Sequence, residues 1–254
     1  MNIPHRTSRP PWLLISDVDH TVLGGDDTTA RFADFVEANR DRLAVCYSSG
    51  RFCDSILDSV ATSALPTPDI VTGGVGTEMR PVRDSPLSTA VDLAAEAWAK
   101  RLDLRWDPDT AHGIAASIDG LARQPEEFQS RYKQSYHWFD ATPEQLDRLR
   151  SALDEAGLNA KVVYSSNRDL DLLPAAADKG AAARHLADHL GYSTDRVIVA
   201  GDSGNDAAFF AHGFRGVVVQ NALPELKAAA PDAYHAKAHE GDGVVEGIEH
   251  HWAN

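Results

Sequence analysis

The chain of 254 residues contains only two cysteines, Cys46 and Cys53. A small secreted domain needs more cysteines at regular spacing, so a disulfide framework is excluded, and we expect Cys46, in its apolar run, to be a buried free thiol. No apolar run approaches the length of a transmembrane helix. Residues 1–11 are polar, contain proline and lack the apolar segment of a signal peptide. These absences lead us to expect a soluble, cytoplasmic protein.

Positive charge is scarce as well. The 24 Lys and Arg residues are outnumbered by 38 Asp and Glu residues, which gives a formal net charge of −14. An acidic surface repels nucleic acids and anionic lipids, so we expect neither nucleic acid nor membrane as a partner. The hydrophobic fraction of 43% and the length suit one large α/β domain, or a core domain with a smaller one. We expect a monomer or a small homo-oligomer.

Short apolar runs alternate with helical patterns in the first and last parts of the chain. Such runs are typical of buried strands, and their alternation with helices predicts parallel strands joined by crossover helices. The predicted strands are residues 12–16, 43–47, 69–72, 196–200 and 216–219. The predicted helices are residues 29–39, 52–63, 179–190 and 244–251, and a further helix is expected to start at 206.

The middle of the chain has a different pattern. It predicts an Ala-rich helix at 89–104, an exposed antiparallel strand at 132–139, an amphipathic helix at 143–156 closed by Gly157, and strands at 161–165 and 169–173. This block is typical of a small α+β domain inserted into a larger one. We therefore predict a doubly wound parallel-sheet (Rossmann-like) α/β core at residues 1–82 and 174–254. Residues 83–173 would form a cap domain.

Asp17 and Asp19 follow the first predicted strand, in the stretch Asp17-Val18-Asp19-His20-Thr21. Residues two apart on an extended segment point the same way, so both carboxylates can face one site. They would repel each other there, and a bound divalent cation would relieve the repulsion. Mg²⁺ prefers oxygen ligands with phosphate completing its shell, so one carboxylate could attack phosphorus while the other handles a proton. An ordinary polar turn is the alternative.

Ser49, Gly50 and Arg51 follow the second predicted strand. A hydroxyl group and exposed backbone N–H groups at the start of a helix form an anion site. The same residues also fit an ordinary helix cap, and the two interpretations are compatible.

Lys179 and residues 201–206 supply the remaining polar groups. Lys179 opens a helix, where the positive helix end disfavours a cation unless an anion such as phosphate is bound nearby. Asp202 could complete a metal shell, and Asp206 could hold Lys179 or a metal-bound water. Taken alone, a surface lysine and an Asx turn would explain these residues. The convergence of four polar clusters matters more, because open parallel sheets bind ligands at the ends of their strands.

These clusters, in this order, resemble the haloacid dehalogenase superfamily of phosphohydrolases. The matching segments are D-x-D-x-T at 17–21, S-G-R at 49–51, Lys179, and G-D-x-x-N-D at 201–206. The resemblance implies Asp17 as nucleophile and Asp19 as general acid and base. It implies a Mg²⁺ site formed by Asp17, the backbone carbonyl of Asp19, and Asp202, with Asp206 supporting it. It implies a phosphate site formed by Ser49, Gly50, Arg51, Lys179 and Asn205.

The inserted block resembles the type IIB cap of that superfamily, and residues 76–78, 132–136 and 169–174 are similar to sucrose-phosphate phosphatases. This implies a small sugar phosphate as substrate, sucrose 6-phosphate first, with Glu78 and Lys133 contacting the sugar. Two departures are His20, where Gly or Asn is more usual, and K-Q-S rather than K-V-S at 133–135. We leave His20 out of the catalytic set. The alternatives are a phosphatase of mannosyl- or glucosyl-glycerol or -glycerate phosphates, a phosphosugar mutase, and a non-catalytic sugar-phosphate sensor.

Overall fold

A computed structural model of the protein describes residues 9–254. Most of the segment on which we based the absence of a signal peptide therefore lies outside the described residues. The chain divides into two compact units, which we call the core unit (Met1–Glu96 and Asp178–Asn254) and the inserted unit (Ala97–Ala177). Each unit has its own sheet and its own apolar core.

The core unit is built on a seven-stranded sheet with the order β11-β10-β9-β1-β2-β3-β4. Its strands are β1 (Trp12–Ser16), β2 (Leu43–Ser48), β3 (Ile70–Gly73), β4 (Glu78–Pro81), β9 (Val197–Gly201), β10 (Arg215–Val218) and β11 (Tyr234–His235). All neighbours pair in parallel except β3 and β4. The predicted doubly wound parallel sheet is confirmed, and β4, which was not predicted, adds an antiparallel strand at this edge. The left-handed glycines Gly74 (φ 59°) and Gly76 (φ 83°) allow the chain to reverse there within a few residues.

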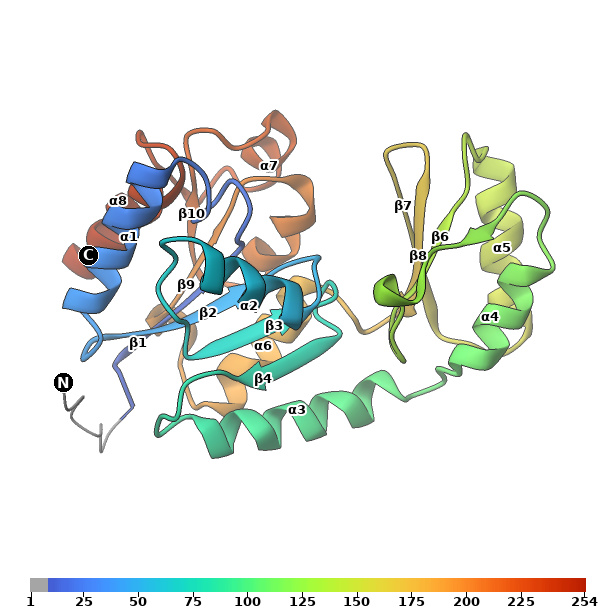
Figure 1. Ribbon diagram of the computed structural model, residues 1–254, viewed down its shortest axis with the longest axis horizontal. Helices are drawn as coiled ribbons and strands as arrows, with labels where there is room; N and C mark the ends of the chain where they lie inside the picture. The colour runs from blue at the N-terminus through green and yellow to red at the C-terminus, as the bar shows by residue number, and fades with distance from the viewer. Residues whose placement is uncertain (1–8) are drawn as a thin grey trace. The chain divides into compact units, whose positions relative to one another are not determined.

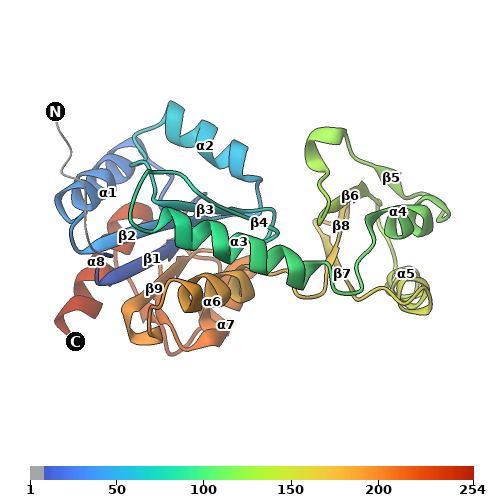
Figure 2. The same cartoon turned by 90° about the horizontal axis from the view of Figure 1, so that it is seen from below.

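Helices cover both faces of this sheet, as Figures 1 and 2 show. They are α1 (Asp26–Ala38), α2 (Cys53–Thr62), α6 (Lys179–His189), α7 (Pro224–Ala229) and α8 (Glu240–Ala253), with the 3₁₀ turns η2 (Thr194–Arg196) and η3 (Gly204–His212). One face of the sheet packs against Phe32, Ile56 and Ile248, from α1, α2 and α8. On α6, the ring of His185 contacts the carbonyl of Ala94 at 2.8 Å. Helices on both faces bury the central strands completely, which explains their unbroken apolar sequences.

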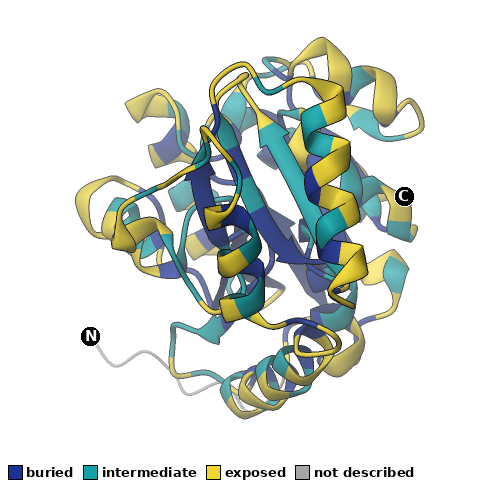
Figure 3. Cartoon of the chain, turned by 90° about the vertical axis from the view of Figure 1, so that its right-hand side faces the viewer, coloured by how far each residue is buried: buried dark blue, intermediate teal, exposed yellow. Residues whose placement is uncertain are grey.

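The inserted unit is a four-stranded antiparallel sheet, ordered β5-β6-β8-β7, with two helices packed on one face. Its elements are α4 (Pro108–Ala116), β5 (Ala122–Arg123), η1 (Glu126–Phe128), β6 (Gln134–His137), α5 (Pro143–Glu155), β7 (Ala160–Ser165) and β8 (Asp169–Pro174). Figure 3 shows the outer surfaces of helices exposed, whereas the strands of this unit range from largely buried in β6 to intermediate in β7 and exposed in β5. The expectation of an exposed strand at 132–139 is wrong, because β6 lies between two strands and its Tyr136 is buried under α4 and α5.

Helix α3 (Ser88–Leu102) crosses the boundary between the units, so the division does not fall at the predicted residues 83 and 173. Its N-terminal half belongs to the core unit, where Val91 and Ala94 are completely buried. The sequence shows one continuous helical pattern here, and a continuous helix carries no local mark of the point at which its packing partners change.

Candidate active site

The register of the core sheet brings together residues that are far apart in sequence. Ser16, the last residue of β1, pairs with Tyr47 on one side and Ala200 on the other. The residues that directly follow β1, β2 and β9 therefore lie together at the carboxyl edge of the sheet. This places Asp17 close to Asp202, and the backbone N–H of Asp17 donates to the carbonyl of Ala200 at 3.0 Å. The predicted convergence of polar groups at this edge is what the strand register produces.

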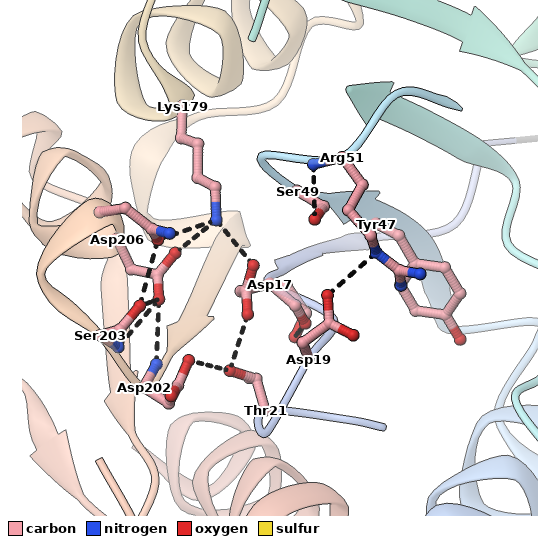
Figure 4. A network of polar contacts seen from close by, with 12 residues as sticks. Asp17, Asp19, Thr21, Tyr47, Ser49, Arg51, Lys179, Asp202, Ser203 and Asp206 are labelled. Carbon is pink, nitrogen blue, oxygen red and sulfur yellow. Dashed lines mark hydrogen bonds and ion pairs between the residues drawn. The ribbon is translucent and has the colours of Figure 1, made fainter. Parts of the chain in front are cut away.

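Lys179 lies at the centre of the site and is only 1% exposed. Its Nζ donates to Asp17 Oδ1 at 2.6 Å and to Asp206 Oδ1 at 2.8 Å, as Figure 4 shows. It also donates to Asn205 Oδ1 at 3.0 Å. Burial opposes the charge of this lysine, but the carboxylates of Asp17 and Asp206 outweigh that effect and raise its pKa above the ordinary value. The lysine therefore stays protonated and can neutralise negative charge at this position.

The site nevertheless holds more negative than positive charge. Asp17, Asp202 and Asp206 each offer one carboxylate oxygen, and these oxygens lie within 4.8 Å of one another. Burial raises the pKa of Asp17 to about 7, and the charges of Asp206 and Asp202 add to that rise while Lys179 opposes it. Burial also raises the pKa of Asp202, again with help from Asp206. Three buried carboxylates around one ammonium group suit a hard divalent cation such as Mg²⁺, which takes oxygen ligands.

Asp206 is positioned by a tight turn. Its Oδ2 accepts hydrogen bonds from the backbone N–H groups of Asp202 (3.0 Å) and Ser203 (3.1 Å), so the carboxylate closes the loop that carries Asp202. A Cβ atom at Gly201 would lie 2.5 Å from Asp206 Cβ, and one at Gly180 would lie 2.1 Å from the carbonyl oxygen of Ala208. Both positions therefore require glycine if α6 and this loop are to approach each other closely enough for Lys179 to reach Asp206.

Asp19 does not join the buried carboxylates. Its side chain is 47% exposed and its Oδ2 lies 3.0 Å from Arg51 Nε. Figure 4 shows the two carboxylates of the D-x-D segment held by different cations, Asp17 by Lys179 and Asp19 by Arg51. The prediction assigned Arg51 to the phosphate site, whereas its side-chain partner in the structure is Asp19.

Ser49 and Gly50 lie at the carboxyl end of β2, beside the start of α2. Ser49 is 3% exposed, and its Oγ accepts a hydrogen bond from the backbone N–H of Arg51 at 3.1 Å. Gly50 has an ordinary φ, and no described atom lies within 4 Å of the position that its Cβ would occupy. The folded chain by itself therefore does not require glycine at this position.

The two residues expected to contact sugar have partners of their own. Glu78, at the start of β4, accepts a hydrogen bond from the backbone N–H of Cys53 at 2.9 Å and so caps α2. In the inserted unit, Lys133 Nζ lies 3.4 Å from Asp171 Oδ2, and Ser135 Oγ donates to Asp171 Oδ1 at 2.6 Å. These three side chains form a polar group on β6, on the residue before it and on β8.

The loop after β1 has two features that the sequence patterns did not predict. Thr21 Oγ1 lies 3.3 Å from both Asp17 Oδ2 and Asp202 Oδ1, so it bridges two of the three buried carboxylates. Its place as the fifth residue of the D-x-D-x-T segment was the available signal. His20 has a left-handed backbone (φ 60°), and its carbonyl accepts a hydrogen bond from Asn221 at 2.7 Å. Gly and Asn adopt that conformation most readily, which explains why histidine is unusual there.

No helix within residues 9–254 is long and apolar enough to cross a membrane.

Residues 10–252 of the chain match the model of a protein family described as sucrose-6F-phosphate phosphohydrolase. A mannosylfructose-phosphate phosphatase of Agrobacterium fabrum is 40% identical over 95% of this chain and 97% of its own length. Sucrose-phosphatase 2 of Nicotiana tabacum is 31% identical over 96% of this chain, and the match spans only 60% of the length of the tobacco protein.

Among solved structures, the sucrose-phosphatase of Synechocystis, in complex with sucrose and phosphate, is similar to this chain with a TM-score of 0.81. It is 31% identical, and the match covers 96% of this chain and 98% of that one. The subclass IIB sugar phosphatase of the haloacid dehalogenase superfamily known as BT4131 has a TM-score of 0.65 at 14% identity, which shows a shared fold. The α/β core with an inserted unit is therefore the fold of this superfamily, as the sequence predicted.

Proposed function

The chain belongs to the sucrose-6F-phosphate phosphohydrolase family and is a sugar phosphatase, and from this premise we propose that its substrate is the phosphate ester of a fructose-containing disaccharide. Sucrose 6-phosphate is the first candidate, because the matching family is described by that activity. A mannosylfructose phosphate is the second, because the relative described by that substrate is 40% identical and matched over 97% of its length. Both are small anions, which the acidic surface of the chain would not attract without the cationic groups of the site.

The observation that carries the chemistry is the buried contact of Lys179 with Asp17 and Asp206. Lys179 engages Oδ1 of Asp17, so Oδ2, whose described contact is Thr21 at 3.3 Å, is the oxygen free to attack phosphorus. Attack forms the Asp17–phosphate bond and breaks the bond between phosphorus and the sugar oxygen. Asp19 gives that oxygen its proton and then takes a proton from the water that hydrolyses the aspartyl-phosphate. Lys179 stays charged throughout and stabilises the phosphoryl oxygens.

Mg²⁺ is the cofactor that we propose for this site. Asp17, Asp202 and the backbone carbonyl of Asp19 would hold the ion, with Asp206 next to it. When bound, the ion supplies positive charge to the phosphoryl oxygens and offsets the excess of carboxylates. The donor set consists only of oxygens, which suits Mg²⁺ better than a metal that prefers sulfur or nitrogen.

In this proposal, the remaining predicted residues bind the substrate. Ser49, Gly50, Lys179 and Asn205 would contact phosphate through a hydroxyl, a backbone N–H, an ammonium and an amide group. Glu78 and Lys133 would contact sugar hydroxyls. The contact of Lys133 with Asp171 in the inserted unit supports its part, because a paired lysine is held in place before it meets a ligand.

A panel of phosphate esters tests the substrate. The purified enzyme with Mg²⁺ would be given sucrose 6-phosphate, mannosylfructose phosphate, glucosylglycerol phosphate, glucose 6-phosphate and p-nitrophenyl phosphate, and released phosphate would be measured. We expect kcat/KM on one of the first two to exceed that on glucose 6-phosphate by at least about 100-fold, because buried polar groups penalise substrates that leave them unpaired. Lys133→Ala should reduce that preference more than it reduces turnover of p-nitrophenyl phosphate. Equal efficiency on all five esters would contradict the proposal.

A further inference from the structure

The contact between Asp19 and Arg51 is an unusual pairing for a proposed general acid. Arg51 Nε lies 3.0 Å from Asp19 Oδ2, and the two side chains are 31% and 47% exposed. Exposed ion pairs of this kind contribute little to folding stability, so stability does not explain the pair. Its position beside the reacting groups makes a role in the reaction the better explanation.

Arg51 is itself held firmly. Its Nη1 donates to Ser59 Oγ at 2.8 Å and to the carbonyl of Ser55 at 3.4 Å, so one edge of the guanidinium is fixed to α2. Its carbonyl accepts a hydrogen bond from the backbone N–H of Gly74 at 2.8 Å, which fixes the main chain as well. The opposite edge is formed by Nε and Nη2, and its Nε lies 3.0 Å from Asp19 Oδ2 as an ion pair, as Figure 4 shows. Both nitrogens are buried, and neither makes a hydrogen bond to a described residue.

That open edge has the geometry that a carboxylate needs. Nε and Nη2 are two parallel donors, and a carboxylate can accept from both at once. Without this partner, Asp19 would be an exposed side chain, free to change rotamer, on a loop with a left-handed residue next to it. A general acid must lie within hydrogen-bond reach of the oxygen that it protonates, so a free rotamer would cost rate.

We propose that Arg51 is a positioning residue that holds the carboxylate of Asp19 in place for proton transfer to the leaving oxygen, rather than a ligand of the transferred phosphate. The inference rests on the proposed phosphatase reaction, in which Asp19 is the general acid. In this inference, Lys179 stabilises the phosphoryl group and Arg51 positions the general acid Asp19. Each carboxylate of the D-x-D segment therefore has its own cation.

The leaving group distinguishes the two roles of Arg51. Nitrophenolate is stable enough to leave without a proton, whereas phenolate depends much more on protonation by a general acid. The value of kcat/KM reports only the steps up to transfer of phosphate to Asp17. Arg51→Gln should therefore lower kcat/KM for phenyl phosphate about tenfold more than for p-nitrophenyl phosphate, because correct placement of a general acid accounts for part of the roughly 10²–10⁴-fold that it contributes. Arg51→Lys keeps the charge but loses the two-donor edge, and it should give an intermediate ratio.

Two further variants complete the test. Arg80→Gln removes an arginine that pairs with Asp54 on the same unit, away from the D-x-D segment, and it should leave the ratio of the two substrates unchanged. In an Asp19→Asn background, Arg51→Gln should change the ratio by less than about twofold, because the residue through which it acts is gone. A crystal structure of Arg51→Gln should show the Asp19 side chain in a different rotamer.

Equal losses on both aryl phosphates, additive effects in the double variant, or an unmoved Asp19 would each overturn the proposal. The substrate assignment fails separately. If the wild-type enzyme cleaves aryl phosphates but no disaccharide phosphate, the proposed substrate is wrong while the leaving-group ratios still decide the role of Arg51. If Asp17→Asn retains aryl phosphatase activity, the proposed reaction itself is wrong.

Discussion

We expect Asp17 to destabilise the protein when no metal is bound, and this gives a test of the site that is independent of turnover. Its carboxylate is 5% exposed and lies near Asp202 and Asp206. Burial, with those charges, raises its pKa from 3.8 to about 7 although Lys179 opposes the rise. The folded protein therefore binds this proton more tightly than the unfolded chain. In chelator, the contribution of this proton to stability should be fully present below about pH 4, should fall between about pH 4 and 7, and should level off above about pH 7.

The size of the effect follows from the same values. A pKa that differs by one between folded and unfolded states is worth about 1.4 kcal/mol, so the rise from 3.8 to about 7 amounts to about 4 kcal/mol once Asp17 is ionised. Asp17→Asn removes the charge and keeps an oxygen that Lys179 can contact. We expect the variant to have almost no turnover. In chelator it should be about 2–4 kcal/mol more stable than the wild type at pH 8, and the difference should shrink to about 1–2 kcal/mol at pH 5, where only the unfolded chain has ionised this carboxyl group.

Urea denaturation at pH 5, 6, 7 and 8, with chelator or with excess Mg²⁺, measures both proteins. Mg²⁺ should stabilise the wild type at pH 8 and should stabilise Asp17→Asn much less, because binding to the folded state alone shifts the equilibrium. The control is Asp147→Asn, a 73% exposed aspartate paired with Arg150 on α5, which should change stability by less than about 0.5 kcal/mol at every pH. An Asp17→Asn variant that is less stable than the wild type at pH 8 in chelator would refute the reasoning.

Four further outcomes are expected. Asp19→Asn should lower kcat for sugar phosphates by roughly 10²–10⁴-fold while Mg²⁺ affinity, measured by calorimetry, changes little; an unchanged rate would remove its proton-transfer role. Chelator should abolish phosphate release and Ca²⁺ should block it, because Ca²⁺ takes more ligands at longer distance; full activity in chelator would contradict the metal site. Gly180→Ala should lower the free energy of unfolding in urea by about 1–3 kcal/mol and reduce turnover, because its Cβ would lie 2.1 Å from a backbone oxygen. Its control, Gly113→Ala on α4, has open space around the new Cβ and should raise the free energy of unfolding by up to about 1 kcal/mol. Gly50→Ala should leave the melting temperature unchanged and raise KM roughly tenfold or more, and an unchanged KM would show that phosphate does not lie against residue 50.

The local patterns of the sequence were sufficient for most of the elements and for the polar residues that meet at one edge of the core sheet. Apolar runs predicted β1, β2, β3 and β9, and helical spacing predicted α3 and α5 within a few residues of their ends. The polar residues after those strands were predicted to converge because parallel strands end at a common edge. These inferences succeed because side-chain periodicity and turn chemistry depend on neighbours in the chain.

Other features depended on partners that no local pattern reveals. Helix α4 was not predicted, and the edge strand β4 and the buried setting of β6 became visible only in the sheets. Lys179 and Asp17 are separated by 162 positions, yet their contact at 2.6 Å, and the rise in the pKa of Asp17, follow from burial at one point in space. The contacts of Arg51 with Asp19, and of Glu78 with the start of α2, likewise could not be read from residue type. Sequence determined which groups are present at this edge of the sheet. Only the tertiary structure decided which cation each carboxylate meets, because that depends on distances set by strand register and helix packing.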